Sequence, residues 1–102
     1  IIYSAAAFAA SSVMIIANKA KTYGALSVKS PAVKSAVQRI ASYFTDKGIG
    51  VFDEEAMNDV YGEIEQAGRI DIDIPDNDLI ALALKKHAEV LVKAEIFAIP
   101  PA

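Results

Sequence analysis

Short apolar runs alternate with helix-length segments along this chain, and no other feature restricts its fold as much. The runs IIY, IGVF and EVLV predict strands at Ile1–Tyr3, Ile49–Phe52 and Glu89–Val92. Helices between short apolar strands are typical of an α/β domain with a parallel sheet. A chain of 102 residues that is 54% hydrophobic can bury one core, so we expect a single domain over residues 1–102.

Capping residues indicate where the predicted helices begin and end. Ser30 is a suitable N-cap, Pro31 suits the first helical position, and Gly48 can end that helix. Asp53 is expected to cap a second helix that Gly68 closes. A third helix, DLIALALKK, leads into the last strand. The apolar faces of these last two elements predict six almost wholly buried residues: Leu79, Leu82, Ala83, Val90, Leu91 and Val92.

The stretch from Ile1 to Ala17 carries no charge. It lacks the basic start of a secretory signal, and it is shorter than the roughly 20 apolar residues of a membrane helix. We therefore expect a buried strand at its start, then a helix of small residues through Ala17, and no membrane association.

The charge balance excludes a polycationic nucleic-acid binder, because the net charge is -3. The chain has no cysteine, which removes disulfides and thiolate nucleophiles and is compatible with the cytoplasm. A nucleic acid could bind a local patch of lysine and tyrosine side chains. The alternative is that these lysines are ordinary solvated surface residues and that some of the tyrosines belong to the core. The candidates are Lys19, Lys21, Lys29, Lys34, Tyr23, Tyr43 and Tyr61.

Four aspartates lie within eight residues at the start of the third helix: Asp71, Asp73, Asp76 and Asp78. Open parallel sheets bind ligands beyond the carboxyl ends of their strands, which would bring Asp76 and Asp78 opposite Glu95. Three carboxylates suit a hard cation such as Mg²⁺ or Mn²⁺, which could activate water against a phosphodiester. The other interpretation is structural. Asp76 would cap the helix, worth about 1 kcal/mol, and Asp71 and Asp73 would form the solvent face of an extended segment.

The segment PDNDLIALALKKHAEVLVKAE resembles the C-terminal half of a PIN domain. In that family an aspartate precedes an Ala-x-Ala helix by five residues, and a Leu-Val strand ending in acidic residues follows. Here Asp76 lies five residues before Ala81, and Glu95 comes shortly after VLV. The arrangement is most similar to the PIN endonucleases that trim precursor small-subunit ribosomal RNA. The resemblance implies a three-layer α/β/α fold with a parallel sheet. Because IFAIPPA ends without the family's further helix and strand, it also implies truncation at the C-terminus.

The resemblance further implies a metal-dependent endoribonuclease that acts on single-stranded or precursor ribosomal RNA. Asp76 and Glu95 match catalytic metal ligands, with Mg²⁺ or Mn²⁺ as the cofactor, and Asp78 could act as a third ligand. Tyr3 and Ser27 stand at ligand positions where the family has carboxylates. Activity is therefore expected to be weakened.

The missing carboxylates leave a second function open, that of a non-catalytic PIN-like domain that binds RNA or a protein partner in ribosome assembly. A third is a small α/β subunit whose acidic loop is only a cap. For the two PIN-like functions we expect RNA as the partner, no DNA specificity, no membrane and a cytoplasmic location.

Overall fold

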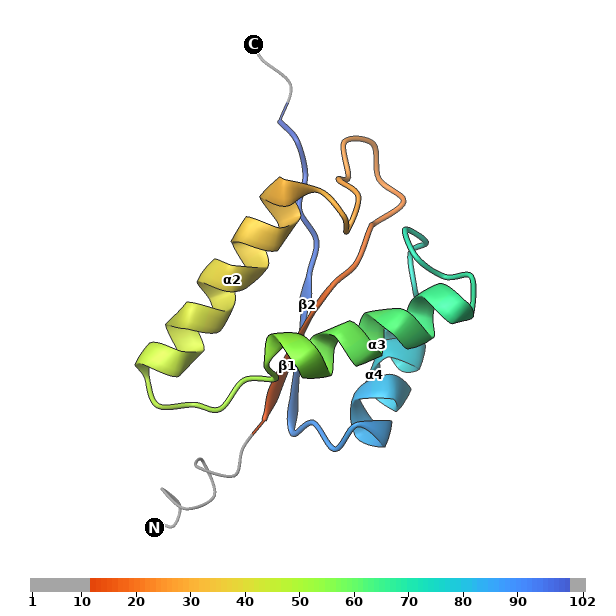
Figure 1. Cartoon of the computed structure of the whole chain (residues 1–102). Helices are drawn as coiled ribbons and strands as arrows, with labels where there is room; N and C mark the ends of the chain where they lie inside the picture. The colour runs from red at the N-terminus through yellow and green to blue at the C-terminus, as the bar shows by residue number, and fades with distance from the viewer. Residues whose placement is uncertain (1–11, 100–102) are drawn as a thin grey trace.

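The computed structural model describes residues 12–99 and confirms an α/β domain with parallel strand pairing. Along the chain, the elements are β1 (Val13–Ala17), α2 (Pro31–Asp46), α3 (Glu54–Gln66), α4 (Asp76–Lys85) and β2 (Val90–Ala94) (Figure 1). The predicted strand Ile1–Tyr3 lies outside the described residues. The last strand was expected at Glu89–Val92 and lies at Val90–Ala94.

The first described strand corrects one expectation. The helix predicted to run through Ala17 is wrong, because Val13–Ala17 forms β1. Its sequence is VMIIA, rich in β-branched residues that suit a pleated strand. All five residues are buried, so β1 lies at the centre of the molecule with both faces covered.

The two strands run parallel, in a register that pairs Val13 with Val90 and Ala17 with Ala94. Val13 also forms a single parallel bridge with Val51 on its other side. Its N–H donates to the Gly50 carbonyl at 2.9 Å, and its carbonyl accepts from Phe52 at 3.0 Å. The strand predicted at 49–52 is thus reduced to this bridge, because α3 begins at Glu54 and leaves no room for a longer ladder.

The predicted helix signals are confirmed, with one difference in detail. Asp53 accepts the N–H of Ala56 at 2.8 Å and so caps α3. Ser30 is the N-cap of α2 with Pro31 next, but its side chain makes no capping hydrogen bond. Gly48 and Gly68 both have positive φ, the left-handed conformation that follows a helix end.

The core lies between β1, α3 and α4. Its buried cluster consists of Met14, Ile16, Val60, Ile64, Ile74, Leu79 and Ala83. Of the residues predicted to be buried, Leu79 and Ala83 are, whereas Leu82, Leu91 and Val92 are half-buried. Val90 is 47% exposed, so its predicted burial is wrong. The reason is its position, because β2 has β1 as its one neighbour in the described sheet and lies at an edge.

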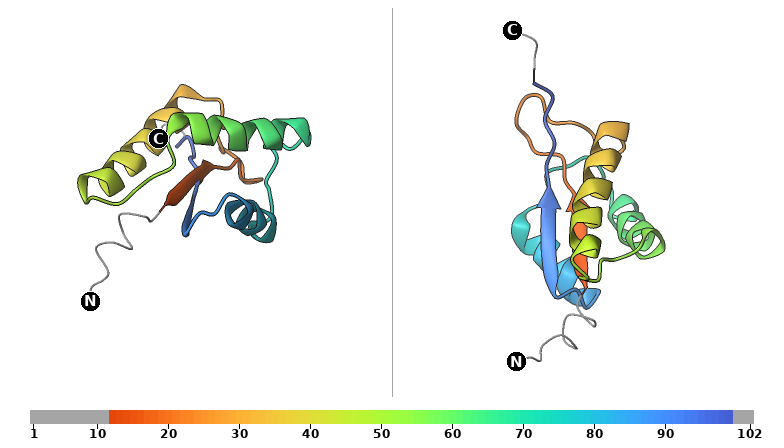
Figure 2. Two further views of the ribbon diagram at one scale, coloured as in Figure 1. Left: turned by 60° about the horizontal axis from the view of Figure 1, so that its bottom comes forward. Right: turned by 90° about the vertical axis from the view of Figure 1, so that its left-hand side faces the viewer.

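Figure 2 shows α2 on one side of the two strands and α4 on the other. Within residues 12–99, none of the helices combines the length and apolar character needed to cross a membrane.

Candidate functional site

Two polar side chains follow the two parallel strands directly. Asn18 comes after β1 and Glu95 after β2. The Asn18 backbone N–H donates to the Ala94 carbonyl at 2.9 Å, which continues the pairing one step past the strands. Both residues therefore lie at the carboxyl edge of the sheet, where parallel α/β proteins place their ligands.

Asn18 is the centre of this edge. It is 3% exposed, and its Nδ2 donates to Asp73 Oδ1 at 2.8 Å and to Glu95 Oε2 at 3.1 Å. Its Oδ1 accepts the backbone N–H of Ile74 at 3.1 Å. Both amide hydrogens and the carbonyl oxygen are thus used, as burial of a polar side chain requires.

Lys93 supplies the positive charge of the same edge. Lys93 and Glu95 are two positions apart on extended chain, so both side chains point to one face. The Lys93 Nζ lies 2.7 Å from Asp76 Oδ1 and 3.8 Å from Glu95 Oε2. The hydrogen bond to Asp76, helped by the charges of Glu95 and Asp73, raises the pKa of Lys93 above its ordinary value. We call Asn18, Asp73, Asp76, Lys93 and Glu95 the strand-end cluster.

The four aspartates of the acidic loop serve different partners. Asp76 is the first residue of α4, but the N-cap is Pro75 and α4 has no side-chain capping bond, so the capping interpretation of Asp76 is wrong. Asp78 points elsewhere and pairs with Arg69 at 2.9 Å. The predicted set therefore separates: Asp76 and Glu95 share one ammonium group, and Asp78 is engaged by a different cation.

Asp71 and Ser27 form a second polar contact. The Ser27 hydroxyl donates to Asp71 Oδ2 at 2.6 Å, and the Val28 N–H donates to Asp71 Oδ1 at 2.8 Å. The bond from Ser27 is the main reason why the pKa of Asp71 lies below its ordinary value. Asp71 and Asp73 were expected to form a solvent face, but both instead hold neighbouring segments.

The resemblance placed one ligand position at Tyr3, after the strand predicted at Ile1–Tyr3. Tyr3 lies outside the described residues, and the residue that directly follows the first described strand is Asn18. Asn18, Asp73 and Lys93 were not among the predicted site residues. Had VMIIA been read as a strand, the polar residue directly after it would have drawn attention to Asn18. Asp73 and Lys93 have no comparable sequence signal.

As arranged, the strand-end cluster does not fit a divalent cation. The carboxylates of Asp76 and Glu95 face the Lys93 ammonium, and those of Asp73 and Glu95 face the Asn18 amide hydrogens. A divalent cation needs free oxygen lone pairs at the positions that these hydrogens occupy. Over residues 12–99, no three carboxylate or histidine side chains group together in a way that could hold a metal ion.

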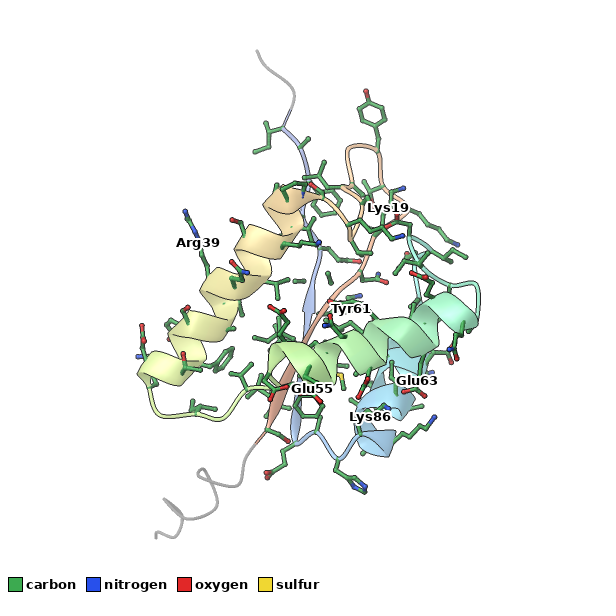
Figure 3. The ribbon with its side chains drawn as sticks, viewed as in Figure 1. Lys19, Arg39, Glu55, Tyr61, Glu63 and Lys86 are labelled. Carbon is green, nitrogen blue, oxygen red and sulfur yellow. The ribbon has the colours of Figure 1, made fainter. Side chains whose placement is uncertain are left out.

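Tyr61 fixes the end of β1 from the helix side. Its hydroxyl oxygen accepts the backbone N–H of Ala17 at 2.8 Å, one residue before Asn18. Burial raises the pKa of Tyr61, while the bond from Ala17 acts in the opposite direction. Figure 3 shows the side chain reaching from α3 toward β1. Tyr61 is thus a structural support of the strand-end cluster.

A second charged cluster joins α3 to α4, away from the strand ends. Glu63 receives the ammonium groups of Lys85, at 2.7 Å, and of Lys86 (Figure 3). The hydrogen bonds from Lys85 and Lys86 lower the pKa of Glu63 from 4.5 to about 2. Because two lysines contact this carboxylate, the cluster links α3 to the end of α4 by surface ion pairs.

Comparison with known proteins assigns no family to this chain. No protein-family model matches it, and neither a curated protein nor a solved structure does. Its function therefore has to be argued from the geometry described above.

Proposed function

We propose that this chain is a PIN-like domain of three-layer α/β/α type that binds single-stranded RNA without cleaving it. The observation that carries the proposal is an exposed tyrosine in a lysine-bearing loop that begins at the strand-end cluster. The loop runs from Lys19 to Lys29, directly after Asn18. Such a domain would bind ribosomal precursor RNA in the cytoplasm, as the resemblance implies.

Tyr23 has the exposure expected of a stacking platform. Its side chain is 95% exposed, so the ring is accessible to a base from solution. Base stacking on such a ring is tolerant of sequence and contributes about 1–3 kcal/mol per base. The loop also carries Lys19, Lys21 and Lys29, of which Lys19 is labelled in Figure 3. Lysines bind phosphates and aromatic rings stack on bases, so a loop that carries both residue types suits a single-stranded nucleic acid.

Backbone hydrogen bonds hold the loop in one conformation, and a fixed conformation supports a binding role. Tyr23 lies in a tight turn in which the Ala25 N–H donates to the Thr22 carbonyl at 3.2 Å. Gly24 has φ +88, and a Cβ there would lie 3.1 Å from the Ala98 oxygen. The Ala98 N–H in turn donates to the Gly24 carbonyl at 2.8 Å. Only glycine suits this position, so the tyrosine is presented on a fixed support.

A second anchor fastens the other end of the loop. Asp71 accepts hydrogen bonds from Ser27 and Val28, as described above. Asp71 belongs to the acidic loop that also supplies Asp73. The acidic loop therefore contacts the lysine-bearing loop through Asp71 and the strand-end cluster through Asp73. RNA held by the loop would therefore lie next to the strand ends.

The test is fluorescence anisotropy with a labelled single-stranded oligoribonucleotide. We expect Tyr23→Ala to weaken binding about tenfold, which corresponds to one lost stacking contact. Tyr43→Ala is the matched control, because Tyr43 is also exposed, at 60%, but lies on α2. Equal affinity of wild type and Tyr23→Ala, or an equal loss in both variants, would reject the loop as the RNA site.

Metal-dependent endoribonuclease activity is the second candidate function. It is favoured by two acidic pairs at the carboxyl edge of the sheet: Asp73 and Glu95 share the Asn18 amide, and Asp76 and Glu95 share the Lys93 ammonium. It would require Mg²⁺ or Mn²⁺ to displace Lys93 from Asp76. RNA cleavage that depends on added Mn²⁺ and disappears in Asp76→Asn would support this function. Intact RNA in every sample would leave binding as the activity.

A further inference from the structure

The strand-end cluster contains three carboxylates but one lysine. Asp73, Asp76 and Glu95 contribute three carboxylates. Two carboxylates that face the same group repel each other, and a positive charge or hydrogen-bond donors between them offset that repulsion. Lys93 provides the charge, and Asn18 provides two N–H groups, as the contacts above establish.

The position of Lys93 is fixed by its strand. Ile16 of β1 is the register partner of Lys93, so backbone pairing with the buried central strand determines where the side chain starts. Its side chain is 31% exposed, and the Glu95 side chain is 26% exposed. The pair stays at the surface, since the Asp76 side chain is 71% exposed, so the strand register rather than burial holds the ammonium beside its acid partners.

Other cations near the acidic loop are engaged with different acids. Arg69 pairs with Asp78 at 2.9 Å, and Lys29 lies 3.8 Å from Glu65. Among the described residues, Lys93 is the one whose ammonium contacts both Asp76 and Glu95.

We propose that the Lys93 ammonium is the resident cation of the strand-end cluster, joining Asp76 to Glu95 in place of a divalent metal ion. A lysine ammonium has three hydrogen-bond donors and one positive charge. It is covalently attached to the chain, so no ion has to bind from solution. A metal ion would have to displace a like charge that is covalently attached to the site. In the wild-type cluster Mg²⁺ or Mn²⁺ would therefore have to compete with Lys93 for the oxygens of Asp76 and Glu95.

This inference uses the same edge as the proposed function but does not depend on RNA binding. If Lys93 is the resident cation, removing its charge leaves Asp76 and Glu95 with oxygen atoms free for a metal. Lys93→Met keeps the aliphatic length and loses the ammonium. Lys85→Met is the matched control, because Lys85 also makes a 2.7 Å contact with a carboxylate, at Glu63, away from the cluster.

The experiment is a Mn²⁺ titration of ¹⁵N-labelled protein, with paramagnetic broadening of backbone amide signals as the readout. We expect no selective broadening in wild type or Lys85→Met at stoichiometric Mn²⁺. In Lys93→Met we expect selective broadening at Asp76 and Glu95, with apparent affinity at least about tenfold higher than in wild type, the change for 1.4 kcal/mol. Selective broadening at these two residues in wild type, or an unchanged response in Lys93→Met, would overturn the proposal.

A measurement that leaves Lys93 in place keeps the proposal testable if Lys93→Met does not fold. The ammonium of Lys93 should give an observable ¹⁵Nζ signal, because its hydrogen bond to Asp76 slows exchange with water. The signal should broaden beyond detection in Asp76→Asn and persist in Asp78→Asn, whose partner is Arg69. A Lys93 signal equally visible in both variants would show that the ammonium is not held by Asp76.

Discussion

The hydroxyl oxygen of Tyr61 lies 2.8 Å from the backbone nitrogen of Ala17 and accepts its hydrogen. Ala17 is the last residue of β1, and the next residue is the buried Asn18. One side chain of α3 thus helps to set where the central strand ends. The geometry of the strand-end cluster depends on that contact.

Tyr61→Phe should destabilise the protein by about 1–3 kcal/mol, because it leaves a largely buried N–H without a partner. Urea unfolding followed by circular dichroism measures the loss. Tyr43→Phe is the control, since Tyr43 is mainly exposed and should change stability by less than about 0.5 kcal/mol. A Tyr61→Phe variant as stable as wild type would mean that water replaces the hydroxyl.

Asn18→Asp should destabilise the protein by about 3 kcal/mol at neutral pH. The substitution removes two N–H donors that meet carboxylates and adds a third negative charge beside Asp73 and Glu95. The measurement is again the free energy of unfolding in urea. Asn58→Asp, at an exposed position of α3, makes the same charge change on the surface and should be nearly neutral. Equal effects of the two substitutions would contradict the central role of Asn18.

Asp71→Ala should release the segment at Ser27 and Val28. Asp71 accepts hydrogen bonds from both and has a φ of 58, a conformation that alanine rarely adopts. Hydrogen exchange of the Val28 amide should accelerate by at least about tenfold, the change for 1.4 kcal/mol. Asp71→Asn is the control, because asparagine keeps an acceptor and tolerates the left-handed region. Unchanged exchange in Asp71→Ala would show that the loop is held by other contacts.

Glu63→Gln should remove one part of the acid sensitivity of the fold. The folded pKa of Glu63 is about 2, against an ordinary 4.5, so its contribution to stability is present above pH 4.5 and lost as the pH falls toward 2. Wild type should be more stable than Glu63→Gln at pH 7, and the difference should shrink through that window. Thermal melts over the pH range measure it, and added salt should reduce it because the group is at the surface.

Glu65→Gln provides the comparison for Glu63. Glu65 lies on the same helix, but its nearest cation, Lys29, is 3.8 Å away and both side chains are about two-thirds exposed. Its removal should change the melting temperature little at any pH. A pH profile of Glu63→Gln that parallels wild type throughout would argue that Lys85 and Lys86 do not hold the carboxylate in solution.

Elements whose ends are marked by capping residues could be predicted from the sequence. Asp53 and Gly68 delimit α3, and Ser30 with Pro31 marks the start of α2, because caps act locally and can be recognised without tertiary contacts. The segment that forms β1 was wrongly predicted to be helical for the opposite reason. The chain from Ile1 to Ala17 is uniformly uncharged, so its hydrophobic pattern contains no break that positions a strand.

The site was predicted only in part, for a related reason. Asp76 and Glu95 could be associated through the rule that strand ends form ligand sites, and both contact Lys93. The role of Lys93 could not be read from its own neighbourhood, since an isolated lysine near a strand end has the same local sequence whether it is solvated or bound. Asp73 is similar: its partner, Asn18, is 55 positions away, and only the assembled fold brings them together.

The parallel pairing of β1 with β2 also determines when the domain can fold. It joins segments that are far apart in the sequence, as the 77 positions between Asn18 and Glu95 show. Long-range pairing of this kind must overcome the entropy of closing a large loop, which slows folding relative to helix formation. During synthesis, β1 leaves the ribosome long before its partner strand exists. The uncharged central strand therefore has to remain unpaired until translation of this segment is nearly finished, and this interval is when the chain is most exposed to aggregation or chaperone binding.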